Sequence, residues 1–195
     1  MTRGRPRGFK EEDALDAAMM LFWRKGFRRT SLDDLVAATK MPRASLYQVF
    51  GDKRALFIRC LDLYGDRFSK RMNEIMTAEP NGKRALAQIL SASADRLTST
   101  AGPPGCLRCD ATVELMGSDE ALDEAIAGAN EKYRRNIELL CRRAVDNREI
   151  TPEIAARLPI FVTSIIAGMV TLARGGATRE ELAILVDQAL LNWPD

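Results

Sequence analysis

The stretch that decides the fold covers residues 30–57 and reads TSLDDLVAATKMPRASLYQVFGDKRALF. Ser31 is a good helix N-cap, and the acidic Asp33 and Asp34 suit the positive end of the helix that follows. Pro42 disfavours helical geometry in the residue before it, so one short helix is predicted to end near residue 40 and a second to begin after the break. Two short helices joined by a tight turn predict a helix-turn-helix, a motif whose second helix fits the major groove of DNA.

The second helix of this motif, residues 43–50, is predicted to present a polar face to DNA. Leu46 and Phe50 point inward, and the other side chains carry no acid, so they leave a surface that suits phosphates or base edges. Gly51 is predicted to end the helix and Asp52 to cap the next one. With its flanking positions, the predicted DNA-binding set is Arg43, Ala44, Ser45, Tyr47, Gln48, Thr30, Ser31 and Lys53.

A basic arm, TRGRPRG, precedes the first predicted helix. We expect Arg3, Arg5 and Arg7 to contact phosphates or a narrow minor groove, and the alternative is a basic tail that only raises solubility. Residues 1–71 hold 16 Lys and Arg against 9 Asp and Glu, whereas residues 72–195 hold 13 against 18. A basic head on an acidic body favours binding of a polyanion, and the other interpretation is chance clustering of charge on solvated faces.

Further residues fit the same motif in a single register: Ala17-Ala18, Leu21-Phe22, Gly26-Phe27, Thr30-Ser31, Asp34-Leu35, Ala37-Ala38, Leu46-Tyr47, Phe50, Lys53 and Leu56-Phe57. With these residues, positions 10–60 resemble the DNA-binding domain of the tetracycline-repressor (TetR) family of bacterial transcription regulators. Two positions depart from the family pattern. Pro42 stands where the family often has Ser or Thr, which changes a backbone contact at the helix start. Val49 stands where the family often has His, which removes a polar group near the DNA.

The spacing of apolar residues along the whole chain predicts an all-α protein. The resemblance implies an N-terminal three-helix helix-turn-helix DNA-binding domain and a C-terminal helical ligand-binding and dimerisation domain. We expect residues 1–52, with the basic arm, to form the first and residues 53–195 to form the second. Besides the two short helices, the predicted helices cover residues 10–25, 53–78, 83–99, 107–116, 119–146, 152–174 and 179–193.

The last two predicted helices are more apolar than a single buried stripe requires. A helix of this kind sits in the centre of its own domain or meets another chain. The resemblance implies the second arrangement, a four-helix bundle formed by two copies of the chain. The predicted dimer interface is Phe161, Ile165, Met169, Leu182, Leu185, Val186 and Ala189.

The resemblance also implies a pocket for a small-molecule effector, which the sequence does not identify. The candidate lining residues are Leu63, Arg67, Cys106, Cys109, Glu114, Phe161 and Ile165. Cys106 and Cys109 form a Cys-x-x-Cys pair, and one interpretation is that they simply pack as two neighbouring side chains of a helix. The other is that they sense oxidants or electrophiles, because the nearby Arg108 favours a thiolate.

Several functional classes are disfavoured by composition. The chain contains no His, so it offers no Ser-His or Cys-His pair and no His pair for a metal, and it has no glycine-rich phosphate loop. We expect no enzyme activity, no metal and no cofactor. No uninterrupted apolar run of about 18 residues and no secretory signal are visible, so we expect a cytoplasmic protein without a membrane span.

Two functions are left open by the residues. The first is a ligand-responsive transcriptional regulator, a homodimeric repressor that binds a palindromic operator in double-stranded DNA and is released by a small-molecule effector. The alternative is a non-specific helical nucleic-acid-binding or interaction protein without small-molecule control. Sequence preference in DNA binding, measured at fixed salt, separates the two.

Overall fold

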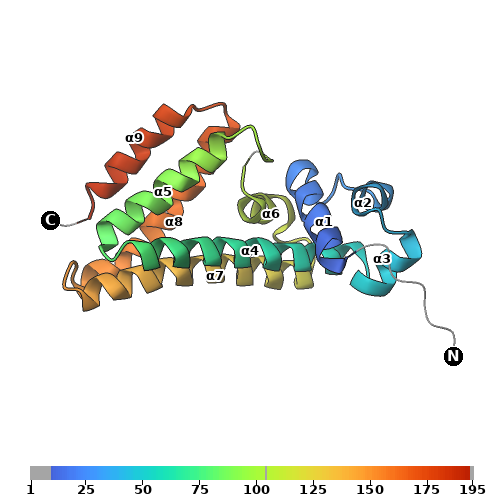
Figure 1. Cartoon of the computed structure of the whole chain (residues 1–195), viewed down its shortest axis with the longest axis horizontal. Coiled ribbons are helices and arrows are strands. Elements are labelled where there is room, and N and C mark those ends of the chain that lie inside the picture. The colour runs from blue at the N-terminus through green and yellow to red at the C-terminus, as the bar shows by residue number, and fades with distance from the viewer. Residues whose placement is uncertain (1–9, 104, 194–195) are drawn as a thin grey trace.

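The computed structural model of the chain describes residues 10–103 and 105–193. Within these ranges it contains nine helices and no strand, which confirms the predicted all-α fold. A head of three short helices lies at one end, and two long helices, α4 and α7, run side by side from it into the body (Figure 1). The helices are α1 (Glu11–Lys25), α2 (Leu32–Thr39), α3 (Arg43–Phe50), α4 (Lys53–Ala78), α5 (Gly82–Thr98), α6 (Leu107–Leu115), α7 (Glu120–Asp146), α8 (Pro152–Arg174) and α9 (Arg179–Leu190).

The helix ends follow local capping chemistry. Ser31 and Asp34 form a capping box at the start of α2, in which the Asp34 N–H donates to Ser31 Oγ at 3.1 Å and the Ser31 N–H donates to Asp34 Oδ2 at 2.7 Å. The Asp52 carboxylate caps α4, as predicted, by accepting a 2.7 Å hydrogen bond from the Ala55 N–H. The last helix ends earlier than predicted, at Leu190, and Trp193 beyond it is buried against the body.

The head is built around Phe22, Leu35 and Leu46, which are each at most 2% exposed. Its core does not stop at the start of α4. Leu107 and Leu115 of α6 are buried in the same cluster, together with residues from the first turns of α7. The head is therefore packed directly onto α6 and α7 as well as onto α4.

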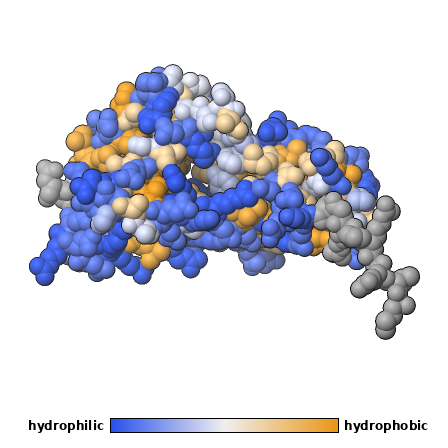
Figure 2. Space-filling view, viewed as in Figure 1, coloured by the Kyte–Doolittle hydropathy of each residue, from blue (hydrophilic) through white to orange (hydrophobic). Residues whose placement is uncertain are grey.

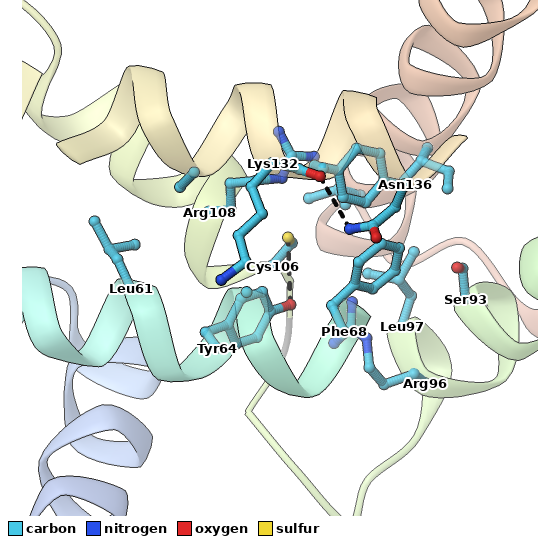
Figure 3. Close-up of a pocket in the computed structure, with 15 residues that line it drawn as sticks. Leu61, Tyr64, Phe68, Ser93, Arg96, Leu97, Cys106, Arg108, Lys132 and Asn136 are labelled. Carbon is cyan, nitrogen blue, oxygen red and sulfur yellow. Dashed lines mark hydrogen bonds between the residues drawn. The ribbon is translucent and has the colours of Figure 1, made fainter. Parts of the chain in front are cut away.

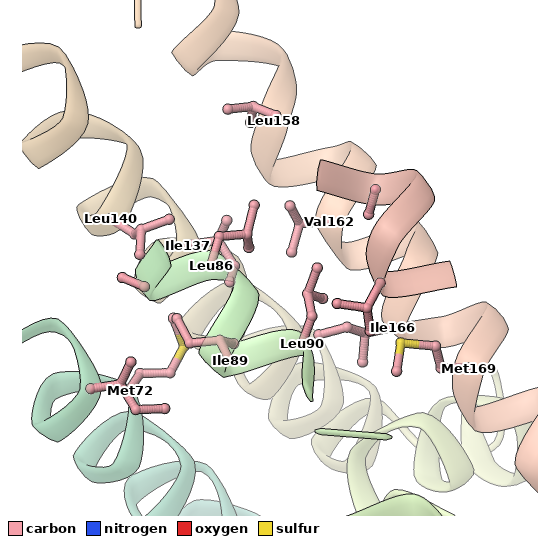
Figure 4. Close-up of a cluster of buried hydrophobic side chains, with 14 of the residues drawn as sticks. Met72, Leu86, Ile89, Leu90, Ile137, Leu140, Leu158, Val162, Ile166 and Met169 are labelled. Carbon is pink, nitrogen blue, oxygen red and sulfur yellow. The ribbon is translucent and has the colours of Figure 1, made fainter. Parts of the chain in front are cut away.

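The body has a second core, to which five helices contribute. Met72 of α4, Ile89 of α5, Ile137 of α7, Val162 of α8 and Leu182 of α9 are each at most 2% exposed (Figure 4 shows the first four). Burying a side chain of this size contributes about 1.5 to 3 kcal/mol to folding. This core fixes the inner faces of α8 and α9 and leaves their outer faces free.

In the part of the chain that the structure describes, one helix, α8, is long and apolar enough to cross a membrane, with a mean hydropathy of 1.8 over its most apolar window. No span was expected from the sequence, because no uninterrupted apolar run of about 18 residues occurs in it. Length and composition alone are weak support for a span, since core helices of folded proteins pass the same test. Here α8 packs against α5, α7 and α9, and only a third of the apolar window is buried within the chain.

Candidate functional site

Helix α3 presents a polar, acid-free face at the surface of the head. Leu46 and Phe50 are 2% and 3% exposed and attach the helix to the core. Arg43, Ala44, Tyr47 and Gln48 are exposed and Ser45 is half-buried, as the sequence predicted. The Arg43 guanidinium lies 2.7 Å from Asp33 Oδ1, but both groups are largely exposed. Such a pair contributes less than about 1 kcal/mol, so Arg43 can leave it for another anion.

Three flanking residues of the predicted set have structural roles. Thr30, which was predicted as a DNA contact, is 1% exposed and its hydroxyl donates a 2.6 Å hydrogen bond to the Gly26 carbonyl oxygen, so its side chain offers little surface to DNA. The Ser31 side chain is engaged in the α2 cap. The Lys53 ammonium lies 4.4 Å from the centre of the Phe27 ring, and partial burial lowers its pKa. Arg3, Arg5 and Arg7 lie outside the described residues.

Glu114, near the end of α6, is bonded directly to the head. Its carboxylate oxygens accept hydrogen bonds from the backbone N–H of Phe27 at 3.0 Å and of Arg28 at 2.7 Å. The turn after α1 adopts a positive φ of 82° at Gly26, where an added Cβ would lie 2.9 Å from Glu114 Oε2. Glu114, which was predicted as a ligand contact, instead directs its carboxylate to backbone that leads into α2.

The body encloses a cavity of about 40 Å³ between α4, α5, α6, α7 and α8, large enough for roughly two or three water molecules. Figure 3 shows residues that line it. The lining residues are Leu61, Tyr64, Gly65, Phe68, Ser93, Arg96, Leu97, Cys106, Arg108, Ala129, Lys132, Tyr133, Asn136, Ile166 and Val170.

Of the seven predicted lining residues, Cys106 alone lines this cavity. Leu63 packs on the head core, and Arg67 is exposed and pairs with Asp16 at 2.6 Å. The prediction missed the helix phase of α4 by one residue, since Tyr64 and Phe68 face the cavity instead. The helix phase of α8 also differs from the prediction by one residue, because Ile166 and Val170 line the cavity in place of Phe161 and Ile165. Cys109 and Glu114 instead line an open groove between the head, α6 and α8.

Cys106 differs from the other thiols in its surroundings. It is the N-cap residue of α6, and the Tyr64 hydroxyl donates a hydrogen bond to its sulfur at 3.3 Å. The hydrogen bond with Cys109 lowers the pKa of Cys106 well below its usual range against the effect of burial, and the charge of Arg108 adds to the shift. The same hydrogen bond, together with burial, raises the pKa of Cys109. Burial raises the pKa of Cys141 to about 12.

The outer faces of α8 and α9 carry exposed apolar side chains. Met169, Leu182, Val186 and Ala189, which were predicted as dimer contacts, are at most 4% exposed and belong to the body core, so they offer little area to a second copy. Phe161, Ile165 and Leu185 are partly buried at the edge of this core. The exposed set is Ile160, Leu172, Ile184 and Leu191, at 47% to 75% exposed. Figure 2 shows hydrophobic surface gathered at the end of the body where α9 lies.

Two family descriptions match the chain. "Bacterial regulatory proteins, tetR family" matches residues 14–60, which hold the head and the start of α4. "Tetracyclin repressor-like, C-terminal domain" matches residues 82–185, which hold most of the body.

Individual relatives cover nearly the full length. The HTH-type transcriptional repressor ComR of Escherichia coli (strain K12) is 35% identical over all of this chain and 93% of its own length. The HTH-type transcriptional repressor BdcR of the same strain is 28% identical over 92% of this chain and 86% of its own length. Among solved structures, a cysteine mutant of the TetR family transcriptional regulator CifR, complexed with 26-base-pair double-strand operator DNA, is 29% identical with a TM-score of 0.88. It covers 98% of this chain and 100% of its own.

Proposed function

Because the chain belongs to the tetR family of bacterial regulatory proteins, we propose that it is a homodimeric transcriptional repressor that binds a palindromic operator and is released by a small-molecule effector. The acid-free exposed face of α3, held to the head by Leu46 and Phe50, carries this proposal. Relatives named as transcriptional repressors, and a similar protein in complex with operator DNA, support it. Such a regulator acts on DNA in the cytoplasm and needs no enzyme activity.

The DNA contacts we propose are Arg43, Ala44, Ser45, Tyr47 and Gln48 of α3, with Ser31, Lys53 and the basic arm as flanking contacts to phosphate. Arginine, tyrosine and amide side chains can donate to base edges and phosphates. An eight-residue helix reads only a half-site, so two heads related by a two-fold axis supply the specificity of a palindrome.

The dimer contact we propose is the outer face of α8 and α9. Ile160, Leu172 and Ile184 offer apolar area that the chain itself does not cover. A Cβ built at Gly168 would meet no atom within 4 Å, so a partner helix can approach closely there. Phe161, Ile165 and Leu185 stay in the proposed interface, at the edge where the body core ends.

The coupling between effector and operator that we propose passes through α6. The N-terminal end of this helix supplies Cys106 and Arg108 to the cavity, and its C-terminal end supplies the Glu114 carboxylate to the head. An effector that shifts α6 therefore changes the position of the head, and its release of DNA is a coupling free energy between two sites. We keep residues 1–52 as the DNA-binding domain and residues 53–195 as the ligand-binding and dimerisation domain.

The experiment that tests this function is fluorescence anisotropy of the purified protein with DNA from directly upstream of its own gene. A scrambled duplex of the same length, at the same salt concentration, is the control. We expect tight binding to the native fragment and weak binding to the control. Equal, salt-sensitive binding to both duplexes would instead support a non-specific nucleic-acid-binding protein.

A further inference from the structure

The effector cavity has a positively charged lining. Arg96, Arg108 and Lys132 line it, and no Asp or Glu is among its lining residues. Lys132 pairs with Asp66 outside the cavity, whereas neither arginine forms an ion pair with a carboxylate in residues 10–103 and 105–193. Even with Cys106 ionised, the two arginines leave an excess of positive charge. A buried cation without a counterion is costly, so this cavity favours an anion.

Arg108 and Tyr133 form a stacked pair on one wall of the cavity. Arg108 is 8% exposed, and its guanidinium carbon lies 4.2 Å from the centre of the Tyr133 ring. Its two terminal nitrogens donate to Asn130 and to the sulfur of Cys109, but Nε has no hydrogen-bond partner among the described residues. The hydroxyl of Tyr133, a residue that is 5% exposed, has none either.

These are two unpartnered donors on stacked side chains, and each can donate to one oxygen of a carboxylate. Burial raises the pKa of Tyr133, so its hydroxyl keeps the proton that it would donate. The remaining wall is apolar, since Phe68 and Leu97 face the same space from α4 and α5 (Figure 3).

We propose that the effector is a small organic monocarboxylate, whose carboxylate binds Arg108 Nε and the Tyr133 hydroxyl and whose apolar part packs against Phe68 and Leu97. This inference rests on the proposed function, because it names the effector class of the same cavity. The volume of about 40 Å³ is smaller than a ligand pocket of a few hundred Å³. Binding therefore widens the cavity and displaces Arg108, and with it α6 and Glu114.

The test is a thermal-shift and calorimetric titration of the full-length protein with propionate and benzoate, against propionamide and benzamide at matched ionic strength. Each amide has nearly the same shape as its acid but no charge. We expect saturable binding of the carboxylates and an affinity at least about tenfold lower for the amides. Binding of neither carboxylate, or equal binding of acid and amide, would overturn the inference.

Two variants locate the site. Arg108→Gln removes the charge of the guanidinium. Tyr133→Phe removes only the hydroxyl and keeps the ring, so it still tests the site if Arg108→Gln fails to fold. Both should weaken benzoate binding, and Arg142→Gln, on the exposed side of α7, should not. Unchanged affinity in Tyr133→Phe and in folded Arg108→Gln would overturn the assignment.

Operator binding measured in the same preparation separates this inference from the proposed function. Specific DNA binding that the carboxylates do not weaken would overturn the effector class and leave the regulator function standing. Saturable carboxylate binding without specific DNA binding would overturn the regulator function instead.

Discussion

The carboxylate of Glu114 accepts a 2.7 Å hydrogen bond from the backbone N–H of Arg28, a residue 86 positions earlier in the chain. This bond joins the helix that borders the body cavity to the turn that leads into α2. The apolar side chains of Leu107 and Leu115, which are buried in the head core, accompany this hydrogen bond. Glu114 is therefore a positioning residue for the head.

Replacing Glu114 tests this role. We expect Glu114→Ala to lower the free energy of unfolding by about 1 to 3 kcal/mol, because two backbone donors lose a charged acceptor. We also expect an effector to release the variant from DNA less effectively than the wild type. Urea unfolding and operator titration with and without effector measure the two effects. Glu124→Ala, an exposed change on α7, is the matched control. Normal release by the Glu114 variant would show that coupling takes another path.

Substitutions on α3 test the proposed DNA face. Tyr47, 46% exposed, can be changed to Ala without a cavity in the core, and the same holds for Arg43. Each change should weaken operator binding by about 1 to 3 kcal/mol per lost contact and leave thermal unfolding unchanged. Leu46→Ala is the contrasting variant, because removal of a 2% exposed side chain should cost about 2 to 5 kcal/mol of stability. Wild-type affinity in both surface variants would place the DNA contact elsewhere.

A charge on the outer face of α9 tests the proposed dimer. Ile184 is 60% exposed within the chain, so Ile184→Lys should leave the fold intact. If this face meets a second copy, the new charge is desolvated there, and dissociation should shift to higher protein concentration in analytical ultracentrifugation. Val113→Lys introduces the same charge at a 90% exposed apolar residue of α6 and serves as the control. Equal dissociation of wild type and Ile184→Lys would remove α9 from the interface.

The sequence predicted the helices well, because caps and breakers are local signals. Ser31, Pro42 and Gly51 each act within a few residues, and α4 and α8 begin and end where their patterns predicted. Which face of a long apolar helix is buried cannot be read from such local signals. On α8 and α9, Met169 and Ile184 are both apolar, yet Met169 is fully buried and Ile184 is 60% exposed. The packing of α8 and α9 against α5 and α7 decides which side of each helix is buried and which is exposed.

The cavity was predicted one residue out of phase on α4 and α8, for the same reason. Arg108 was noted for its effect on the thiols, but its stacking on Tyr133 joins residues 25 positions apart and leaves no signal in either local sequence. Likewise Glu114 reads as an ordinary charged residue of a helix, since its partners are backbone N–H groups of another element. Long-range polar contacts of this kind need the fold before they can be seen.

The ionisation of Cys106 decides between packing and sensing for the Cys-x-x-Cys pair. A pKa in the folded protein below the usual 9.0 means that, between those two values, the unfolded chain binds more protons than the native state. The contribution of Cys106 to the free energy of unfolding should therefore rise with pH in this window, stay constant above pH 9.0, and be lost as pH falls through the folded pKa. Urea unfolding of wild type and Cys106→Ser at several pH values measures this contribution, because the variant lacks the ionising thiol and should show no increase in stability from it.

Cys141→Ser is the control, since burial raises the pKa of this thiol to about 12. Below pH 9.0 Cys141 is protonated in both states and adds no pH dependence. Between pH 9.0 and about 12 it opposes folding, because only the unfolded chain ionises there. The ultraviolet absorbance of the thiolate, followed against pH, gives a second readout that reports Cys106 alone below pH 9.0. Parallel stability curves for wild type and Cys106→Ser, with no thiolate signal in this range, would leave Cys106 as a packed thiol, because a sensor of oxidants or electrophiles reacts through its thiolate.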